Sequence, residues 1–176
     1  LYNYVTKIPG EMKFMPTRRS FISKIALGLA SIPLTSLLYG MYRGKYNFKV
    51  LHYELEYDDL PEAFDGFTIT QISDIHSGSF DNVEKVNYGI DLINKQQSDV
   101  VLFTGDLVNN TSKEVLPWIP HFSKISAPHG VYSVLGNHDY GDYMRWDSPE
   151  EKVKNIEDLY QAQKDMGWEL LLNESR

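Results

Sequence analysis

The chain contains no cysteine among its 176 residues. This absence excludes disulfide bonds and metal sites built on thiolates. The sequence also lacks internal repeats and low-complexity tracts. Its 42% hydrophobic and 13% aromatic residues are typical of a globular protein rather than a disordered one. The length is sufficient for one domain with a hydrophobic core.

Positive charge is scarce outside the N-terminal segment. Residues 1–47 contain seven Lys and Arg residues and one acidic residue, whereas residues 48–176 contain ten and 23. The two parts therefore carry net charges of +6 and −13. This asymmetry predicts a basic segment over residues 1–47 and a separate acidic domain over residues 48–176. An acidic domain binds nucleic acid poorly, so we expect no nucleic-acid partner.

The N-terminal segment contains an uncharged run of 18 residues, from Ile25 to Tyr42. Arg18 and Arg19 precede it, and a paired arginine before an apolar run resembles a twin-arginine export signal. A membrane span needs about 17–25 residues. Because the arginines would stay on the cytoplasmic side, we expect a location at the cell membrane, with the domain on the extracytoplasmic side. The run ends without a small-x-small cleavage site, which favours an uncleaved anchor over a removed peptide. A core helix capped by surface arginines is the remaining alternative.

Residues able to bind metal follow three apolar stretches of the acidic domain. The first stretch, residues 67–76, reads Phe-Thr-Ile-Thr-Gln-Ile-Ser-Asp-Ile-His. In an extended strand, Asp74 and His76 would point to the same side, where they could share an ion. A carboxylate oxygen and an imidazole nitrogen suit Zn, Mn or Fe better than Ca. Taken alone, the pair is equally compatible with an exposed aspartate and a loop histidine.

The second and third stretches end in the same way. In residues 100–106, the apolar run ends at Gly105 and is followed by Asp106. In residues 131–139, it ends at Gly136 and is followed by Asn137, His138 and Asp139. The glycines allow sharp turns and close approach of the backbone to a ligand. In open α/β sheets, ligands bind beyond the carboxyl ends of the strands. We therefore expect the polar residues of the three stretches to meet.

Hydrophobic periodicity places further elements between these stretches. Strict alternation over residues 51–57 predicts a half-buried strand, and helical spacing over residues 82–97 and 148–166 predicts two amphipathic helices. Thr111 with Glu114 predicts a short helix with a capping box. Trp118 and Phe122 are expected in the core. The alternation of strands and helices argues for an α/β domain built from βαβ units. A last strand begins at residues 168–173.

The three motifs together resemble the calcineurin-like metallophosphoesterase family. They are Asp74-x-His76, Gly105-Asp106 and Gly136-Asn137-His138-Asp139, and the resemblance covers residues 49–173. It implies a sandwich of two mixed sheets flanked by helices, with the site at the strand ends. It also implies two divalent metal ions, Mn, Zn or Fe, and a phosphate-ester substrate. The implied activity is hydrolysis of phosphate esters, phosphodiesters in particular, by a metal-activated hydroxide.

The same resemblance implies a role for each residue of the motifs. Asp74 and His76 would hold one ion, Asp106 would bridge both ions, and Asn137 would contact the second ion through its amide oxygen. His138 would protonate the leaving alkoxide. Asp139 would either orient His138 or shape its turn. The aromatic residues after this motif could form a substrate platform or a packed lid.

The family supplies further metal-binding histidines from later strands, but no histidine follows His138 in this sequence. We therefore expect the chain to represent the N-terminal portion of the domain, with the C-terminal part missing. On its own it should hold about one ion at most and be inactive. The alternative function is a non-catalytic, membrane-tethered binding domain with a degenerate metal site. A third option is an aspartyl-phosphate phosphatase with Asp74 as nucleophile, although His76 argues against it. The expected location favours lipid-linked or wall-linked phosphates as substrates.

The paired arginines provide a direct test of the export route. Replacing both Arg18 and Arg19 with lysine should block export through the twin-arginine pathway and leave the fold unchanged, because the residues act as a signal outside the domain. The measurement is the accessibility of the domain to protease added outside intact cells. Unchanged accessibility would eliminate this route, although not the membrane anchor.

Overall fold

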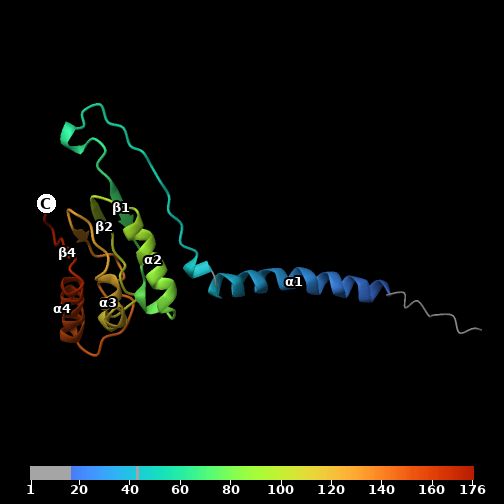
Figure 1. Ribbon diagram of the computed structural model, residues 1–176. Helices are drawn as coiled ribbons and strands as arrows, with labels where there is room; N and C mark the ends of the chain where they lie inside the picture. The colour runs from blue at the N-terminus through green and yellow to red at the C-terminus, as the bar shows by residue number, and fades with distance from the viewer. Residues whose placement is uncertain (1–16, 43) are drawn as a thin grey trace, which may run out of the picture. The chain divides into compact units, whose positions relative to one another are not determined.

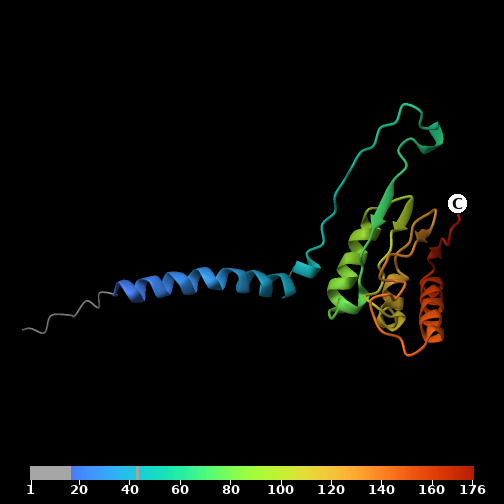
Figure 2. The same cartoon turned by 180° about the vertical axis from the view of Figure 1, so that it is seen from behind.

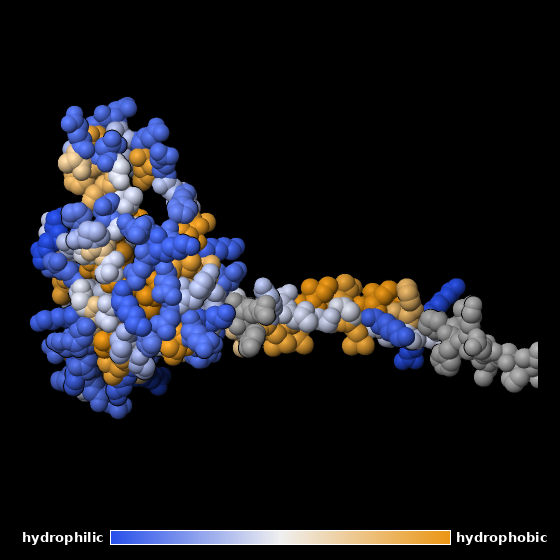
Figure 3. Space-filling view, in the orientation of Figure 1, coloured by the Kyte–Doolittle hydropathy of each residue, from blue (hydrophilic) through white to orange (hydrophobic). Residues whose placement is uncertain are grey.

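The computed structural model describes residues 17–42 and 44–176, which divide into two compact units between Asn47 and Phe48. The remaining N-terminal residues and Arg43 lie outside the described part of the chain. The first unit contains helix α1, Arg18–Tyr42, and a short 3₁₀ turn, Gly44–Tyr46. Figure 3 shows hydrophobic residues along much of α1.

Helix α1 exposes apolar side chains on all sides rather than along one stripe. The exposed residues include Leu27, Leu29, Ile32, Leu34 and Leu37. A helix that is hydrophobic all round needs an apolar environment, such as a bilayer. None of its most apolar 18-residue window is buried, and the helix is long and apolar enough to cross a membrane. By length and composition, the helix is compatible with the membrane anchor predicted from the sequence. The internal Pro33 is compatible with a membrane span.

The second unit is built on one four-stranded sheet. Its strands are β1, Ile69–Ile72, β2, Val100–Phe103, β3, Val131–Ser133, and β4, Glu169–Leu170. They lie in the order β1-β2-β3-β4, and every pair is parallel. The α/β class predicted from the sequence is therefore confirmed. This parallel sheet with its helices is consistent with the calcineurin-like fold that the resemblance implied, and the described residues contain one of its sheets.

Helices connect the successive strands. They are α2, Val83–Lys95, α3, Ile119–Phe122, and α4, Pro149–Asp165, with short 3₁₀ turns at Glu62–Phe64, Ser77–Ser79, Ser112–Glu114 and Leu116–Trp118. The three helices lie side by side in chain order in both views (Figures 1 and 2). Parallel strands require such crossovers, because the chain must return to the same end of the sheet before the next strand begins.

The hydrophobic core lies where the central strands meet the helices. Phe103 of β2 is buried and packs on Trp168, with ring centroids 5.3 Å apart. The predicted core residues Trp118 and Phe122 are both buried. Leu159 of α4 is completely buried. This packing holds β2 and β3 in place, and with them the loops that leave their carboxyl ends.

The helix starts follow local capping chemistry. Asn82 accepts a hydrogen bond from the backbone N–H of Lys85, and Ser148 accepts one from Glu151. The capping box of Thr111 and Glu114 is also present. Side-chain acceptors at these positions satisfy N–H groups that the first turn leaves unpaired.

The predicted burial was wrong at three places. The segment 51–57 forms no strand, and Leu51 and Tyr53 are 69% and 80% exposed. Alternation favours a strand only where a neighbouring strand supplies hydrogen-bond partners, and among the described residues no strand pairs with this segment. Strand β1 lies at the sheet edge, so Ile69 is exposed rather than buried. In α4, Val153 is exposed as well, whereas Leu159 of the predicted stripe is buried.

The packing of α4 predicts a strong dependence on Leu159. The Leu159→Ala variant should lose about 2–5 kcal/mol of unfolding free energy, because the leucine is fully buried and its removal leaves a cavity. Leu116→Ala is the matched control, since Leu116 is 52% exposed and its truncation should cost about 0.5 kcal/mol or less. The measurement is urea unfolding of the detergent-solubilised chain, followed by tryptophan fluorescence. Equal losses in the two variants would contradict this account of the core.

Candidate metal centre

Asp74 and His76 are placed by left-handed turns and not by an extended strand. Strand β1 ends at Ile72, and the φ angles of Asp74 and His76 are 53° and 46°. The expectation that both residues continue the strand was therefore wrong. The two side chains nevertheless approach each other, with His76 Nε2 3.9 Å from Asp74 Oδ1. Aspartate and histidine tolerate this backbone region better than most residues.

The loop after β2 runs beside this turn. The backbone N–H groups of Asp74 and His76 donate to the carbonyl oxygens of Gly105 and Asp106, both at 3.0 Å. Asp106 has a φ of 63° and Gly105 a φ of 105°. Asp74, His76 and Asp106 thus have strained backbone conformations. Such conformations persist only where surrounding contacts hold them.

Two glycines allow the second and third loops to touch. A Cβ atom on Gly105 would lie 2.3 Å from the backbone nitrogen of Gly136, and a Cβ on Gly136 would lie 2.2 Å from Asp106 Oδ1. Any side chain at either position would push the loops apart. The sequence argument that these glycines permit close approach is therefore specific: each glycine accommodates the other loop.

The carboxylate of Asp139 joins these two loops. Its Oδ1 accepts hydrogen bonds from Leu107 and Val108 at 2.8 and 3.2 Å, and its Oδ2 accepts from Asp106 and Gly136, both at 2.9 Å. The residue is fully buried. Burial raises the pKa of this carboxyl, while the four N–H donors oppose the rise. Of the two roles considered for Asp139, these contacts correspond to shaping the turn.

The candidate ligands gather where these loops meet. One potential ligand atom each from His76, Asp106 and His138 lie within 4.8 Å of one another. His76 Nε2 is 3.9 Å from Asp106 Oδ2, the same distance as from Asp74. Two ligands that each lie about 2.1 Å from an ion are separated by about 3.0–4.2 Å. The distance from His76 to each carboxylate is therefore compatible with a shared ion, whereas the group of atoms within 4.8 Å of one another includes His138 and leaves Asp74 out. Imidazole with carboxylate suits a transition metal.

His138 is held at both its backbone and its ring. Its N–H donates to Asp106 Oδ1 at 2.8 Å, and its Nδ1 lies 2.7 Å from the carbonyl oxygen of Asn109. Because a carbonyl oxygen only accepts, Nδ1 carries the proton and donates it. Nε2 is then available either as a metal ligand or as a proton carrier toward a substrate.

Asn137 and His138 both contact Tyr143. Asn137 Nδ2 donates to the hydroxyl oxygen of Tyr143 at 2.8 Å, and the rings of His138 and Tyr143 are stacked with centroids 4.5 Å apart. The sequence placed aromatic residues beside the site but gave no contact for Tyr143. It also gave no sign of the Asn109 carbonyl, because a backbone acceptor has no signature in the residue type.

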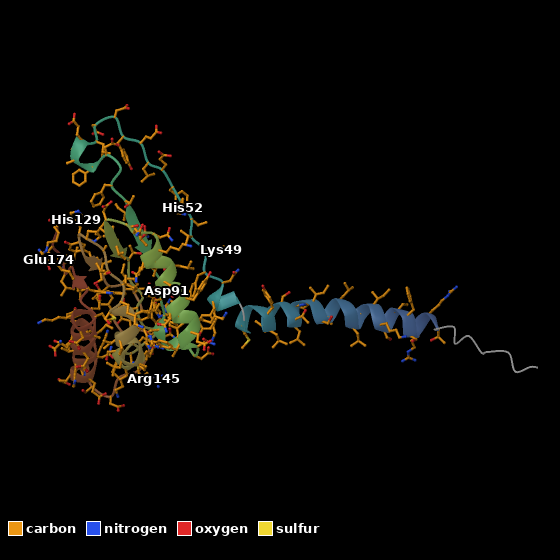
Figure 4. All side chains as sticks on the ribbon, viewed as in Figure 1. Lys49, His52, Asp91, His129, Arg145 and Glu174 are labelled. Atoms are coloured by element: carbon orange, nitrogen blue, oxygen red, sulfur yellow. The ribbon has the colours of Figure 1, made fainter. Side chains whose placement is uncertain are left out.

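The other histidines lie away from this cluster. His121 of α3 bonds with Asn87 of α2, and the backbone of His129 bonds to Asp99 before the strands begin. Figure 4 shows His129 far from Arg145, which follows the site loop, and His52 on the segment leading to β1. Among the described residues, these three histidines therefore stand outside the candidate ligand group.

Comparison with known proteins gives two family matches. The family described as "Calcineurin-like phosphoesterase" matches residues 67–173, and "Probable Calcineurin-like phosphoesterase, transmembrane domain" matches residues 1–45. The uncharacterized metallophosphoesterase YkuE of Bacillus subtilis is 32% identical over 132 residues, 72% of this chain and 46% of the relative.

Two further relatives extend the comparison. A transmembrane protein with metallophosphoesterase domain from Danio rerio is 27% identical over 135 residues, 73% of this chain and 31% of the relative. UDP-2,3-diacylglucosamine pyrophosphatase LpxG of Chlamydia trachomatis is 35% identical over 96 residues, 51% of this chain and 28% of the relative. The chain thus spans less than half the length of these curated relatives. No solved structure matches the chain.

The buried carboxylate predicts that Asp139→Asn destabilises the domain. The amide nitrogen must replace one of the two oxygens, so two N–H donors lose their acceptor. Each buried donor left unpaired costs about 1–3 kcal/mol. Urea unfolding measures the loss. Asp158→Asn is the matched control, because Asp158 forms an exposed pair with Lys154 and should contribute about 0.5 kcal/mol or less. If Asp139→Asn were as stable as the control, the Asp139 carboxylate would not be what joins the loops after β2 and β3.

Proposed function

The chain belongs to the calcineurin-like phosphoesterase family. We propose that it carries part of the active site of a metal-dependent hydrolase that cleaves phosphate esters, phosphodiesters in particular. One observation carries the proposal. Three loops from the carboxyl ends of adjacent parallel strands bring Asp74, His76, Asp106 and His138 together. Mixed imidazole and carboxylate donors at this edge of a sheet are the donor set that such hydrolysis requires.

The proposed ligand roles follow from position. Asp74, His76 and Asp106 would hold one divalent ion, and the 3.9 Å distances from His76 Nε2 to each of the two carboxylates support this assignment. Asp106 would also face a second ion, with Asn137 as a further oxygen ligand. Bound divalent ions would offset phosphate charge and lower the pKa of a coordinated water. The protein's own contribution is to fix the donors before a ligand arrives, through the backbone bonds that hold both loops.

His138 is proposed as the proton donor to the leaving group. When the phosphorus–oxygen bond breaks, the departing oxygen needs a proton, and Nε2 of a doubly protonated His138 can give it. The bond from Nδ1 to the Asn109 carbonyl stays in place during this transfer and keeps the ring oriented. The backbone bond to Asp106 keeps His138 beside the proposed ions.

The substrate class is proposed from the location. Helix α1 and the transmembrane-family match over residues 1–45 support membrane attachment. We further propose that Arg18 and Arg19 direct export, so that the domain acts outside the cytoplasm on lipid-linked or wall-linked phosphates. The name of the Chlamydia relative assigns it a diacylated sugar nucleotide, which supports a phosphate carried on an acylated molecule as the substrate here.

The separate roles of Asp106 and His138 give a sharp test of this function. With Mn²⁺ or Zn²⁺, a detergent-solubilised protein that contains this chain together with the later strands expected from the family should hydrolyse a chromogenic phosphodiester. Chelation of the metal should abolish turnover. Asp106→Asn should lose both turnover and bound metal, because a bridging ligand is removed. His138→Ala should keep its metal while turnover falls by about 10²- to 10⁴-fold, the usual contribution of a general acid.

Metal content, measured by elemental analysis of each purified variant, separates the two roles. His129→Ala is the matched control, because this exposed histidine lies outside the cluster and its loss should change neither quantity. Loss of metal from His138→Ala would make His138 a ligand instead. A wild-type protein that binds metal without turnover on any phosphate ester would favour a non-catalytic, membrane-tethered binding domain.

A further inference from the structure

Tyr143 is an exposed residue that contacts two site residues at once. It is 62% exposed, so it contributes little to the hydrophobic core. Its hydroxyl accepts a hydrogen bond from Asn137 Nδ2 at 2.8 Å, and its ring stacks on His138 with an interplanar angle of 28°. A large aromatic side chain that leaves most of its surface in water is more readily explained by these polar partners than by packing.

The loop that carries Tyr143 is fixed by its own contacts. The Gly141 N–H donates to the His138 carbonyl at 3.0 Å, and Trp146 Nε1 donates to the Gly141 carbonyl at 2.7 Å. Asp142 forms an ion pair with Lys152 of α4. Bonds on both sides of Tyr143 thus define the path of the backbone, so the position of the phenol is set before any ligand binds.

The hydroxyl contact leaves one end of the Asn137 carboxamide free. An amide side chain offers an acceptor oxygen at one end and a donor nitrogen at the other. Because Nδ2 is engaged by Tyr143, Oδ1 remains available, and only Oδ1 can bind a cation. A rotated amide would present N–H groups to a positive ion, which is unfavourable. The observed orientation is therefore the one that a metal ligand needs, and the hydroxyl bond holds the side chain in place in it.

The ring contact limits the motion of His138. One face of the imidazole stacks on Tyr143, and the His76 ring meets the imidazole at 89° with centroids 4.8 Å apart. Together with the Nδ1 bond to Asn109, these contacts restrict rotation of the ring. Stacked and edge-to-face arrangements are the favourable geometries for pairs of aromatic rings.

We propose that Tyr143 is a positioning residue of the phosphoesterase site, whose hydroxyl orients Asn137 for metal and whose ring orients His138. The inference rests on the proposed function, because it assigns Tyr143 to the same centre. It divides the side chain into two separable parts. The hydroxyl acts on metal affinity, and the ring acts on turnover.

The test is a metal titration of the complete protein in detergent. Tyr143→Phe keeps the ring and removes the hydroxyl, so the affinity for Mn²⁺ measured by calorimetry should fall by about 10- to 100-fold, as for other partners of metal ligands. Asn137→Ala should weaken the same binding event. In the Asn137→Ala background, Tyr143→Phe should change the affinity by no more than about twofold, because its route of action is already gone. Tyr140→Phe is the matched control and should behave as the wild type.

A second variant tests the ring. Tyr143→Leu removes both contacts, and at saturating Mn²⁺ its kcat should fall about 2- to 10-fold below that of Tyr143→Phe, since only the leucine variant loses the stacking. The inference is overturned if Asn137→Ala weakens Mn²⁺ binding while Tyr143→Phe does not. If Asn137→Ala itself leaves Mn²⁺ binding unchanged, the ligand role proposed for Asn137 fails first, and the role of the hydroxyl fails with it.

Discussion

The arrangement of the site depends on one buried carboxylate. Asp139 accepts four backbone N–H bonds, three from the loop after β2 and one from the loop after β3. A buried charge is costly unless it is fully hydrogen-bonded, so this group is stable only while both loops keep their paths. Asp106 and His138 sit on these two loops. The relative position of Asp106, a proposed metal ligand, and His138, a proposed proton donor, is therefore coupled to the bonds of the Asp139 carboxylate.

The left-handed residues show the cost of this arrangement. Asp74, His76 and Asp106 each have a positive φ, a conformation that costs an ordinary residue about 1 kcal/mol or more. The backbone bonds from the first turn to the second loop offset part of this strain. The left-handed turns after β1 and β2 bring Asp74, His76 and Asp106 near one another through these loop contacts.

Local sequence signals predicted the parts of the fold that depend on local chemistry. Helix α2 and strand β2 formed where periodicity placed them, because caps and apolar spacing act within a few residues. The segment 51–57 did not form a strand, since alternation cannot supply a pairing partner. For the site, residue type and order named the candidate ligands. The turn geometry of His76 and the stacking of Tyr143 were beyond reach, because both depend on contacts between separate loops.

Charge explains why a site of this kind needs cations to act on phosphate. Residues 48–176 carry a net charge of −13, so the domain as a whole repels an anionic substrate. Asp74 and Asp106 add two carboxylates at the very place where the phosphate would bind. Bound divalent ions are often the largest local charges in a protein site, and they can reverse the sign of the potential there while the rest of the surface stays negative. The same carboxylates that would repel a phosphate ester in the metal-free protein would then be the groups that allow the protein to bind one.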